Sequence, residues 1–446
     1  MLPQIKPSKK DIYLDHAATT PLDSRVKQAM APFWDEYYGN PSSLYKKGRE
    51  GTNAIAAARD TIAKIINSRP DEIVFTAGGT ESVNLAIFGA ARAYEQTHKR
   101  KGHLIASAIE HHAVLHSLDA LKLEGWETTL IDVDEFGFIK LDELKKAVRD
   151  NTVLISVMYA NNEIGTIEPI DEIGKWLKVE NSQRATRNLP QIYFHTDACQ
   201  AGGALNLDVQ KLHVDLMTVN ASKMYGPKQI GFLFVKNGVR IKPLIYGGGQ
   251  EKNLRSGTEN VPAIIGLAES LKLGQKESPK ENARLIKLRD YFIDQLFKKV
   301  PKIVLNGPDD RKLTTYDLQL ITRLPNNINI SILDIEGEAL LLYLDAYNIS
   351  MSTGSACTST SLDPSHVILA IGRPYEYAHG SMRFTLGKST TKADIDYVMK
   401  VLPGIVEELR RISPVNLDIN NPKAITMEKA FVGENMKKFT NAKLKS

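Results

Sequence analysis

Two charged side chains stand at the ends of apolar stretches, where they are suited to chemistry. Lys223 follows the apolar stretch 216–220, and a lysine desolvated there has the lowered pKa that a Schiff-base lysine needs. Asp197 ends the stretch 192–196, where a carboxylate is costly to bury without a cationic partner. Each residue also has a plainer interpretation, a solvated lysine and a helix N-cap. Position alone favours these plainer interpretations.

A glycine turn between an apolar run and a helical pattern indicates an anion site. In the segment 76–82, Gly78 and Gly79 precede Thr80 and a helix start. Such a turn offers free backbone N–H groups and the positive end of a helix dipole to a phosphate. The glycine spacing fits neither the Walker loop nor the Rossmann fingerprint. A capped turn without a ligand is equally consistent with this segment.

The chain has two cysteines, Cys199 and Cys357, too few for a disulfide framework or a thiolate zinc site. Cys357 stands in a run of Ser, Thr, Gly and Ala over residues 352–361, which predicts a flexible loop with an exposed thiol. An exposed thiol is a liability unless the protein uses it. Cys199 follows an alanine beside an apolar run, and we expect a buried, inert thiol there.

An arginine and a histidine pair complete the set of candidates. Arg383 lies within an apolar segment, where a guanidinium requires an anionic partner, either a core carboxylate or a substrate carboxylate. His111 and His112 lie between a predicted strand and a predicted helix. A ring at that place can reach a cofactor, although surface histidines without a task are commoner.

Alternating strands and helices position these residues. Apolar runs covered on both faces alternate with helical patterns, which predicts βαβ units and a mainly parallel sheet. Ligands then bind beyond the carboxyl ends of the strands. The predicted strands are 72–76, 103–107, 152–158, 192–196, 216–220 and 230–235, and the predicted helices between them include 83–96, 113–124 and 141–148.

The second half of the chain predicts a smaller α+β unit. A long helix is expected over 263–300, and a capping box at Thr391–Asp394 begins the last strong helix. Between them, the predicted strands are 327–333, 349–352 and 382–385. The polar segment 178–191 is predicted to be a surface loop. Beyond residue 414 the periodicity is lost, and we expect a partly ordered tail.

Composition excludes several classes of protein. A net charge of +5 on 446 residues is weak support for a nucleic-acid partner. All of that excess lies at the two ends of the chain, which could touch an acidic partner. The first residues lack a signal-peptide core, and the apolar runs are too short to span a bilayer. We therefore expect a cytoplasmic protein with no membrane association, no metal site and no direct nucleic-acid contact.

Together these segments resemble the pyridoxal-phosphate-dependent cysteine desulfurases that supply iron–sulfur cluster assembly. The resemblance implies an α/β fold of the aspartate-aminotransferase type, with a mainly parallel seven-stranded sheet, and a homodimer. It also implies a large cofactor domain over 16–262, a small domain over 1–15 and 263–414 carrying a mobile cysteine loop, and a basic tail over 415–446. The segments that carry the resemblance are 13–21, 39–43, 76–84, 161–165, 197–200, 225–228, 255–258 and 354–359.

The resemblance assigns roles toward the cofactor, pyridoxal 5'-phosphate. Lys223 matches the lysine that joins it as a Schiff base, and Asp197 matches the carboxylate that keeps the pyridine nitrogen protonated. His111 matches the ring that stacks on the cofactor and is a candidate proton carrier. The other matching residues bind the phosphate or the ring oxygen: Gly79 and Thr80 for the phosphate, Thr258 for the phosphate of the neighbouring subunit, and Asn162 and Gln200 for the oxygen.

The resemblance also assigns the substrate residues. Arg383 matches the arginine that holds the carboxylate of L-cysteine, and Asn162 lies near the same carboxylate. Cys357 matches the nucleophile that takes the sulfur as a persulfide, leaving L-alanine. The sequence departs from the family at Ser222 and Asn220, where a histidine and a serine are usual. The Ser222 hydroxyl can still donate to a phosphate, so Asn220 and Ser222 are kept as cofactor-binding residues.

The expected activity is therefore sulfur transfer from L-cysteine to an acceptor such as an iron–sulfur scaffold, or into a thio-cofactor. Selenocysteine lyase and aminotransferase activities are the alternatives on the same cofactor, although an aminotransferase needs no thiol such as Cys357. A non-catalytic assembly platform is a further alternative. A platform has no need of Lys223, Asp197, Arg383 and Cys357 together.

Overall fold

A seven-stranded sheet forms the larger part of the computed structural model, which describes residues 3–312, 322–353 and 364–413. Its strand order is β2-β8-β7-β6-β5-β3-β4, and β8 runs antiparallel to both neighbours while the others pair in parallel from β7 to β4. The mainly parallel sheet is thus confirmed. The strands are β2 (Ile73–Thr76), β3 (His103–Ser107), β4 (Glu127–Ile131), β5 (Thr152–Ser156), β6 (Tyr193–Asp197), β7 (Leu216–Asn220) and β8 (Gly231–Val235).

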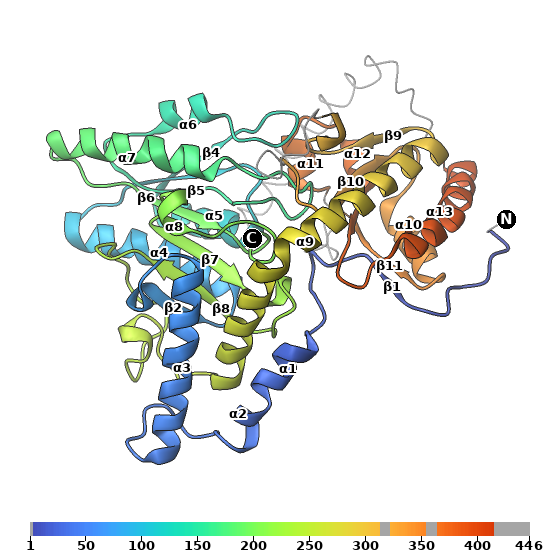
Figure 1. Ribbon diagram of the computed structural model, residues 1–446. Coiled ribbons are helices and arrows are strands. Elements are labelled where there is room, and N and C mark those ends of the chain that lie inside the picture. The colour runs from blue at the N-terminus through green and yellow to red at the C-terminus, as the bar shows by residue number, and fades with distance from the viewer. Residues whose placement is uncertain (1–2, 313–321, 354–363, 414–446) are drawn as a thin grey trace, which may run out of the picture.

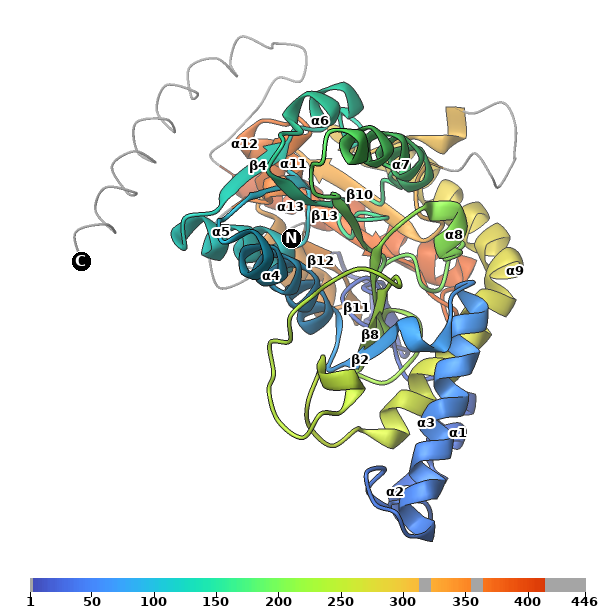
Figure 2. The same ribbon diagram turned by 90° about the vertical axis from the view of Figure 1, so that its left-hand side faces the viewer.

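Helices cover both faces of this sheet, as Figures 1 and 2 show. On one face, α4 (Gly79–His98) and α5 (His112–Leu123) pack through Val83, Leu85, Val114 and Leu118. The other face is covered by α3 (Lys46–Ile65), α6 (Leu141–Ala147), α7 (Ile170–Thr186) and the first turns of α9 (Val261–Lys299). Burial on both faces explains why most of these strands are uninterrupted apolar runs.

A smaller antiparallel sheet of four strands has its own apolar core, in the order β12-β13-β10-β9. A parallel pair, β1 and β11, joins the N-terminal segment to this part of the molecule. The helix α13 begins at the predicted capping box, in which Thr391 and Asp394 bond reciprocally. The elements are β1 (Ile12–Tyr13), β9 (Ile303–Leu305), β10 (Asn327–Ile332), α10 (Gly337–Asp345), β11 (Ile349–Ser350), β12 (Ser352–Thr353), β13 (Ser381–Thr385) and α13 (Lys392–Ile412).

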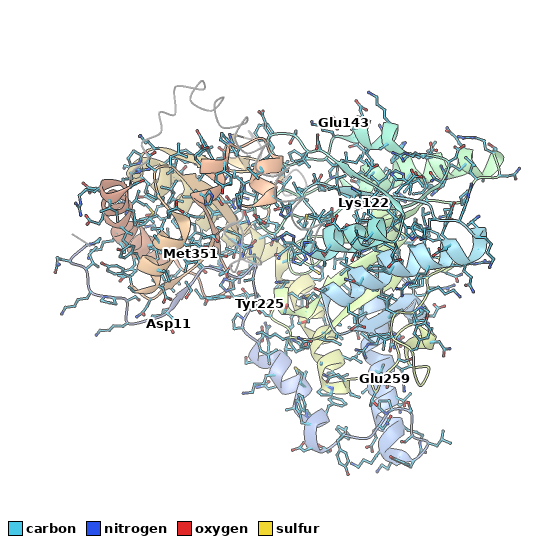
Figure 3. All side chains as sticks on the ribbon, turned by 180° about the vertical axis from the view of Figure 1, so that it is seen from behind. Asp11, Lys122, Glu143, Tyr225, Glu259 and Met351 are labelled. Carbon is cyan, nitrogen blue, oxygen red and sulfur yellow. The ribbon has the colours of Figure 1, made fainter. Side chains whose placement is uncertain are left out.

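The long helix α9 contributes to both cores. Ile264 and Leu267 near its start pack into the larger core, whereas Phe292 and Leu296 near its end pack into the smaller one. In Figure 3, Tyr225 lies where the two parts meet. Its backbone N–H donates to Thr20 Oγ1, and its hydroxyl accepts from the backbone N–H of Lys388 across the junction. The domain division predicted at residue 262 stays a proposal.

One strand is missing from the sequence prediction, and one predicted feature is wrong. No strand was expected at β4, an edge strand whose side chains are mostly half-buried or exposed, so it lacks the apolar run that marks the other strands. The predicted surface loop 178–191 is largely helical, because α7 continues to Thr186. Arg184 is 1 % exposed and donates to the carbonyls of Arg149, Asp150 and Pro190. A buried arginine therefore holds the end of a helix that looks polar in sequence.

The remaining short helices are α1 (Ser24–Met30), α2 (Pro32–Asp35), α8 (Val209–Leu212), α11 (His366–Ala370) and α12 (Tyr375–His379). Within the three described ranges, no helix combines the length and apolarity that crossing a bilayer requires. The same ranges contain no cluster of three or more His, Cys, Asp or Glu side chains suited to a metal ion.

Candidate active site

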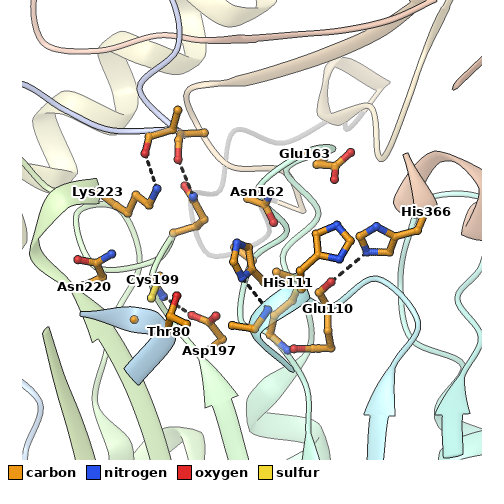
Figure 4. Close-up of a pocket in the computed structure, with 18 of the residues that line it drawn as sticks. Thr80, Glu110, His111, Asn162, Glu163, Asp197, Cys199, Asn220, Lys223 and His366 are labelled. Carbon is orange, nitrogen blue, oxygen red and sulfur yellow. Dashed lines mark hydrogen bonds between the residues drawn. The ribbon is translucent and has the colours of Figure 1, made fainter. Parts of the chain in front are cut away.

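A cavity of about 580 Å³ lies beyond the carboxyl ends of the parallel strands, a volume typical of small-molecule sites. Its wall is built from residues between Ala17 and Lys223 together with Pro364, Ser365, His366 and Arg383 from the C-terminal half of the chain. Figure 4 shows Lys223 on one side of this cavity and His366 on the other, with His111 between them. The cavity is where the topology rule places a ligand.

The glycine turn forms one end of the cavity. Gly78 has φ 139°, a conformation that favours glycine, and Gly79 begins the 20-residue helix α4. A Cβ added to Gly79 would lie 2.8 Å from Cys199 Sγ and 3.6 Å from Asn220 Cβ. The absence of a side chain at Gly79 therefore leaves the helix N-terminus open as an anion cradle. Thr80 also lines the cavity, and no side chain caps the helix.

The lysine and the aspartate come from two neighbouring strands. Asp197 is the last residue of β6, and its Oδ1 accepts from the backbone N–H of Cys199 at 2.9 Å. Lys223 ends the short turn after β7, and its Nζ donates to the carbonyl of Ala18 at 2.5 Å. Beneath Asp197, His195 bonds to Ser156 and Thr218, and burial lowers its pKa to about 4. A neutral histidine therefore supports the strand end without adding charge.

His111, Gln200 and Asn162 also line the cavity. His111 is the N-cap of α5, and its Nδ1 accepts from the backbone N–H of Ala113 at 3.1 Å. This bond fixes the orientation of the ring at the cavity wall. Gln200 Nε2 donates to the carbonyl of Ala17 at 3.0 Å.

Arg383 is held by the protein but not saturated. It is 2 % exposed; its Nη2 donates to Asp15 Oδ1 at 2.8 Å and its Nη1 to the carbonyl of Asn162 at 3.0 Å. Its Nε is buried without a partner. A buried unpaired donor is costly, and Arg383 lines the cavity. The predicted core carboxylate is thus present as Asp15, and donor capacity remains for a substrate carboxylate.

Some predicted residues are not in this cavity. Asn220 lines it and accepts from the backbone N–H of Ser222, whereas Ser222 and Thr258 are absent from its lining. Thr258 is exposed. Cys357 and the basic tail 415–446 lie outside the described residues.

The prediction that Cys199 is a buried, inert thiol is wrong in part. Its side chain is half-buried and lines the cavity beside Gly79. Desolvation raises the pKa of the thiol well above its usual value, and the adjacent Asp197 raises it further. Cys199 is therefore a neutral thiol at the cavity wall, a poor nucleophile.

Two glutamates line the cavity without a role predicted from sequence. Glu110 and Glu163 are buried. Burial raises the pKa of Glu110 well above its usual value and that of Glu163 to about 7, although Ser365, Arg383 and His111 oppose the shift for Glu163. His366, also unassigned, bonds through Nε2 to the carbonyl of Glu110 at 3.0 Å. In the sequence, the two glutamates are marked by their neighbours, because Glu110 precedes His111 and Glu163 follows Asn162.

These residues fit pyridoxal phosphate. The open helix N-terminus at Gly79 suits a phosphate, Asp197 offers a carboxylate to a ring nitrogen, and Lys223 offers an amine to an aldehyde. Arg383, with its unpaired Nε, suits the carboxylate of an amino acid. The donor set therefore matches both the cofactor and an amino-acid substrate.

Comparison with known proteins gives the same result. Residues 12–398 match the family described as aminotransferase class-V. The cysteine desulfurase IscS of Dictyoglomus turgidum is 50 % identical over 406 residues, which are 91 % of this chain and 97 % of that protein. The IscS of Methanosarcina thermophila is 47 % identical over 92 % of this chain and 96 % of that protein. A solved NifS-like protein superposes with a TM-score of 0.79 at 34 % identity, covering 90 % of this chain and all of that one.

The chain therefore belongs to the class-V aminotransferase family, in the aspartate-aminotransferase-type fold. Its long, high-identity matches lie among enzymes named cysteine desulfurase. It is a pyridoxal-phosphate-dependent cysteine desulfurase.

Proposed function

We propose that the enzyme converts L-cysteine to L-alanine and keeps the sulfur as a persulfide on Cys357. The observation that carries this assignment is the grouping of Lys223, Asp197 and the incompletely paired Arg383 in one cavity. A solved relative, 33 % identical over 84 % of this chain, is described as SspA in complex with cysteine. Both observations favour an amino-acid thiol as the substrate.

Each residue has a separate task in this reaction. Arg383 binds the substrate carboxylate through Nε, with Asp15 and the Asn162 carbonyl holding the guanidinium in place. Lys223 Nζ takes the proton from Cα. Asp197 keeps a proton on the pyridine nitrogen of the bound cofactor, which then serves as an electron sink. His111, at the cavity wall, is positioned to carry protons.

The sulfur-transfer step balances without an added oxidant. The Cys357 thiolate attacks the substrate sulfur, so that an S–S bond forms as the Cβ–S bond breaks. The electron pair of the broken bond stays with carbon, which takes up a proton and becomes the methyl group of alanine. Lys223 Nζ returns a proton to Cα. The products are L-alanine and the persulfide of Cys357, and a second thiol then removes the outer sulfur.

A homodimer is supported by the surface. Large apolar side chains are exposed on residues 32–45, here called the N-terminal extension, and on the loop after β8. They include Trp34, Tyr38, Leu44 and Tyr246, an arrangement typical of a protein interface. Thr258 is exposed outside the cavity. Glu259, the next residue, lies near this extension in Figure 3. We propose that Thr258 binds the cofactor phosphate of the partner subunit.

The physiological setting is proposed from the relatives. Enzymes named IscS and NifS-like suggest that the persulfide serves iron–sulfur cluster or thio-cofactor synthesis, with a scaffold protein as acceptor. We propose a cytoplasmic enzyme, in keeping with its two cysteines.

A lysine pair tests the assignment of Lys223. With pyridoxal phosphate and L-cysteine, Lys223→Ala should form alanine and sulfide at less than about a thousandth of the wild-type rate, since it lacks the proton-transferring amine. Lys228 is the matched control because it is exposed, lies outside the cavity and donates to the carbonyl of Thr20. Equal turnover by both variants would remove Lys223 from the mechanism.

A further inference from the structure

Polar contacts hold both the backbone and the side chain of Glu163, a buried residue of the cavity. Its backbone N–H donates to Asn161 Oδ1 at 2.8 Å, and its carbonyl accepts from the side-chain amides of Asn327 and Asn329 at 3.0 and 3.1 Å. Its side chain is 6 % exposed. The backbone at this position is therefore held by both parts of the molecule.

The carboxyl group of Glu163 bonds to Ser365, the N-cap of α11. The Ser365 hydroxyl donates to Glu163 Oε2 at 2.5 Å and accepts from the backbone N–H of Ile368, capping α11. Ser365 is 3 % exposed, so this bond is shielded from water and stronger than an exposed one. The Ser365 hydroxyl caps α11 by itself, whereas burying the Glu163 carboxyl group costs free energy. The burial of Glu163 therefore suggests a second purpose.

Ser365 is the second residue of the described range 364–413, which begins downstream of Cys357. It follows Cys357 by eight residues. On the other side of Cys357, Ser352 pairs with Arg383 and Thr353 with Met382 in the smaller sheet. Both flanks are thus attached next to the substrate site: one to the strand that carries Arg383, the other to the residue that follows Asn162.

We propose that Glu163 is a positioning residue for sulfur transfer, fixing Ser365 and thereby the downstream end of the segment that carries Cys357 beside the substrate site. This inference rests on the proposed role of Cys357. Attaching both ends of a short segment raises the effective concentration of a group between them. Glu163 acts through Ser365 and does not itself react with the substrate.

Substitution of Glu163 should not unfold α11. Val367 and Ile368 of α11 are fully buried against Ile109, Met158 and Ile164, and this apolar contact remains in the variants. We therefore expect Glu163→Ala and Ser365→Ala each to slow persulfide formation on Cys357 about 5- to 20-fold, with KM for L-cysteine unchanged within about twofold. The double variant should be no slower than either single variant, because both remove the same bond.

Two measurements separate positioning from general damage. Exchange of the Cα proton of L-alanine in deuterated water uses Lys223 and the cofactor but not Cys357, and it should keep the wild-type rate in Glu163→Ala. Glu163→Gln and Ser365→Thr keep an acceptor and a hydroxyl, so they should restore persulfide formation to within about threefold of wild type. Glu168→Gln is the matched control, since Glu168 is also buried with a raised pKa but does not line the cavity.

The outcomes distinguish this inference from the function on which it rests. If Cys357→Ser forms sulfide at the wild-type rate, the proposed function fails. If Cys357→Ser is inactive while Glu163→Ala transfers sulfur at the wild-type rate, the positioning role alone is overturned. A parallel loss of proton exchange and sulfur transfer in Glu163→Ala, or additive effects in the double variant, would also overturn it.

Discussion

Arg383 and Asp15 form an ion pair of 2.8 Å that uses only Nη2 of the guanidinium, and Nε is left buried without a partner. Asp15 follows β1, and Arg383 lies in the middle of β13. The ion pair therefore holds the guanidinium at the cavity wall and leaves its Nε donor without an acceptor. A carboxylate that enters the cavity can supply that acceptor.

We expect Arg383→Lys to raise KM for L-cysteine about 10- to 100-fold, because a hydrogen bond to a charged group is worth about 1.5–3 kcal/mol. Asp15→Asn keeps an acceptor for Nη2 and should raise KM less, about threefold. Steady-state kinetics with L-cysteine measure both changes. A lower kcat at unchanged KM in Arg383→Lys would contradict the assignment of the substrate carboxylate to this residue.

Gly79→Ala tests the anion cradle. The new Cβ would lie 2.8 Å from Cys199 Sγ, and relief of such a clash costs about 1–3 kcal/mol. We expect the dissociation constant for pyridoxal phosphate to rise about 10- to 100-fold, as measured by absorbance titration of the apoprotein. Adding Cys199→Ala removes the sulfur and should recover part of the affinity. Wild-type affinity in Gly79→Ala would show that the cofactor phosphate lies elsewhere.

Glu168 makes stability depend on pH. Burial raises its pKa from 4.5 to about 8 in the folded protein, and Oε1 lacks a partner. The folded state therefore holds a proton that the unfolded state loses above about pH 4.5, so this contribution to stability is complete below that pH and falls as pH rises to about 8. Wild type loses this stability between about pH 5 and about pH 8, whereas Glu168→Gln does not. The free energy of unfolding of the variant minus that of wild type should therefore increase by ~2–4 kcal/mol over this range.

Denaturant unfolding at the two pH values measures this difference, and titrations shared by the two proteins cancel. No gain in Glu168→Gln over this pH range would show that Glu168 is ionised in the folded protein.

Residues at strand ends could be predicted because local sequence places them. Asp197, Lys223 and Gly79 each adjoin an apolar run, and parallel strands bring such ends to one edge of a sheet. Their roles came from the family resemblance, since each pattern alone fits a plainer interpretation.

Features that depend on distant partners could not be predicted. Glu163 looks like any polar loop residue until Ser365, 202 positions away, is placed against it. Arg184 looks like part of a solvated face, but the carbonyls of residues 149 and 150 surround it in the fold. The edge strand β4 has no buried face to mark it in sequence.

A single turnover shows whether Cys357 carries the sulfur. The holoenzyme is mixed with less than one equivalent of L-cysteine, alanine is quantified, and the trapped protein is digested for mass spectrometry. We expect one added sulfur atom on the Cys357 peptide for each alanine formed, with none on the Cys199 peptide. Full alanine formation with the added sulfur on Cys199, or on neither cysteine, would contradict it.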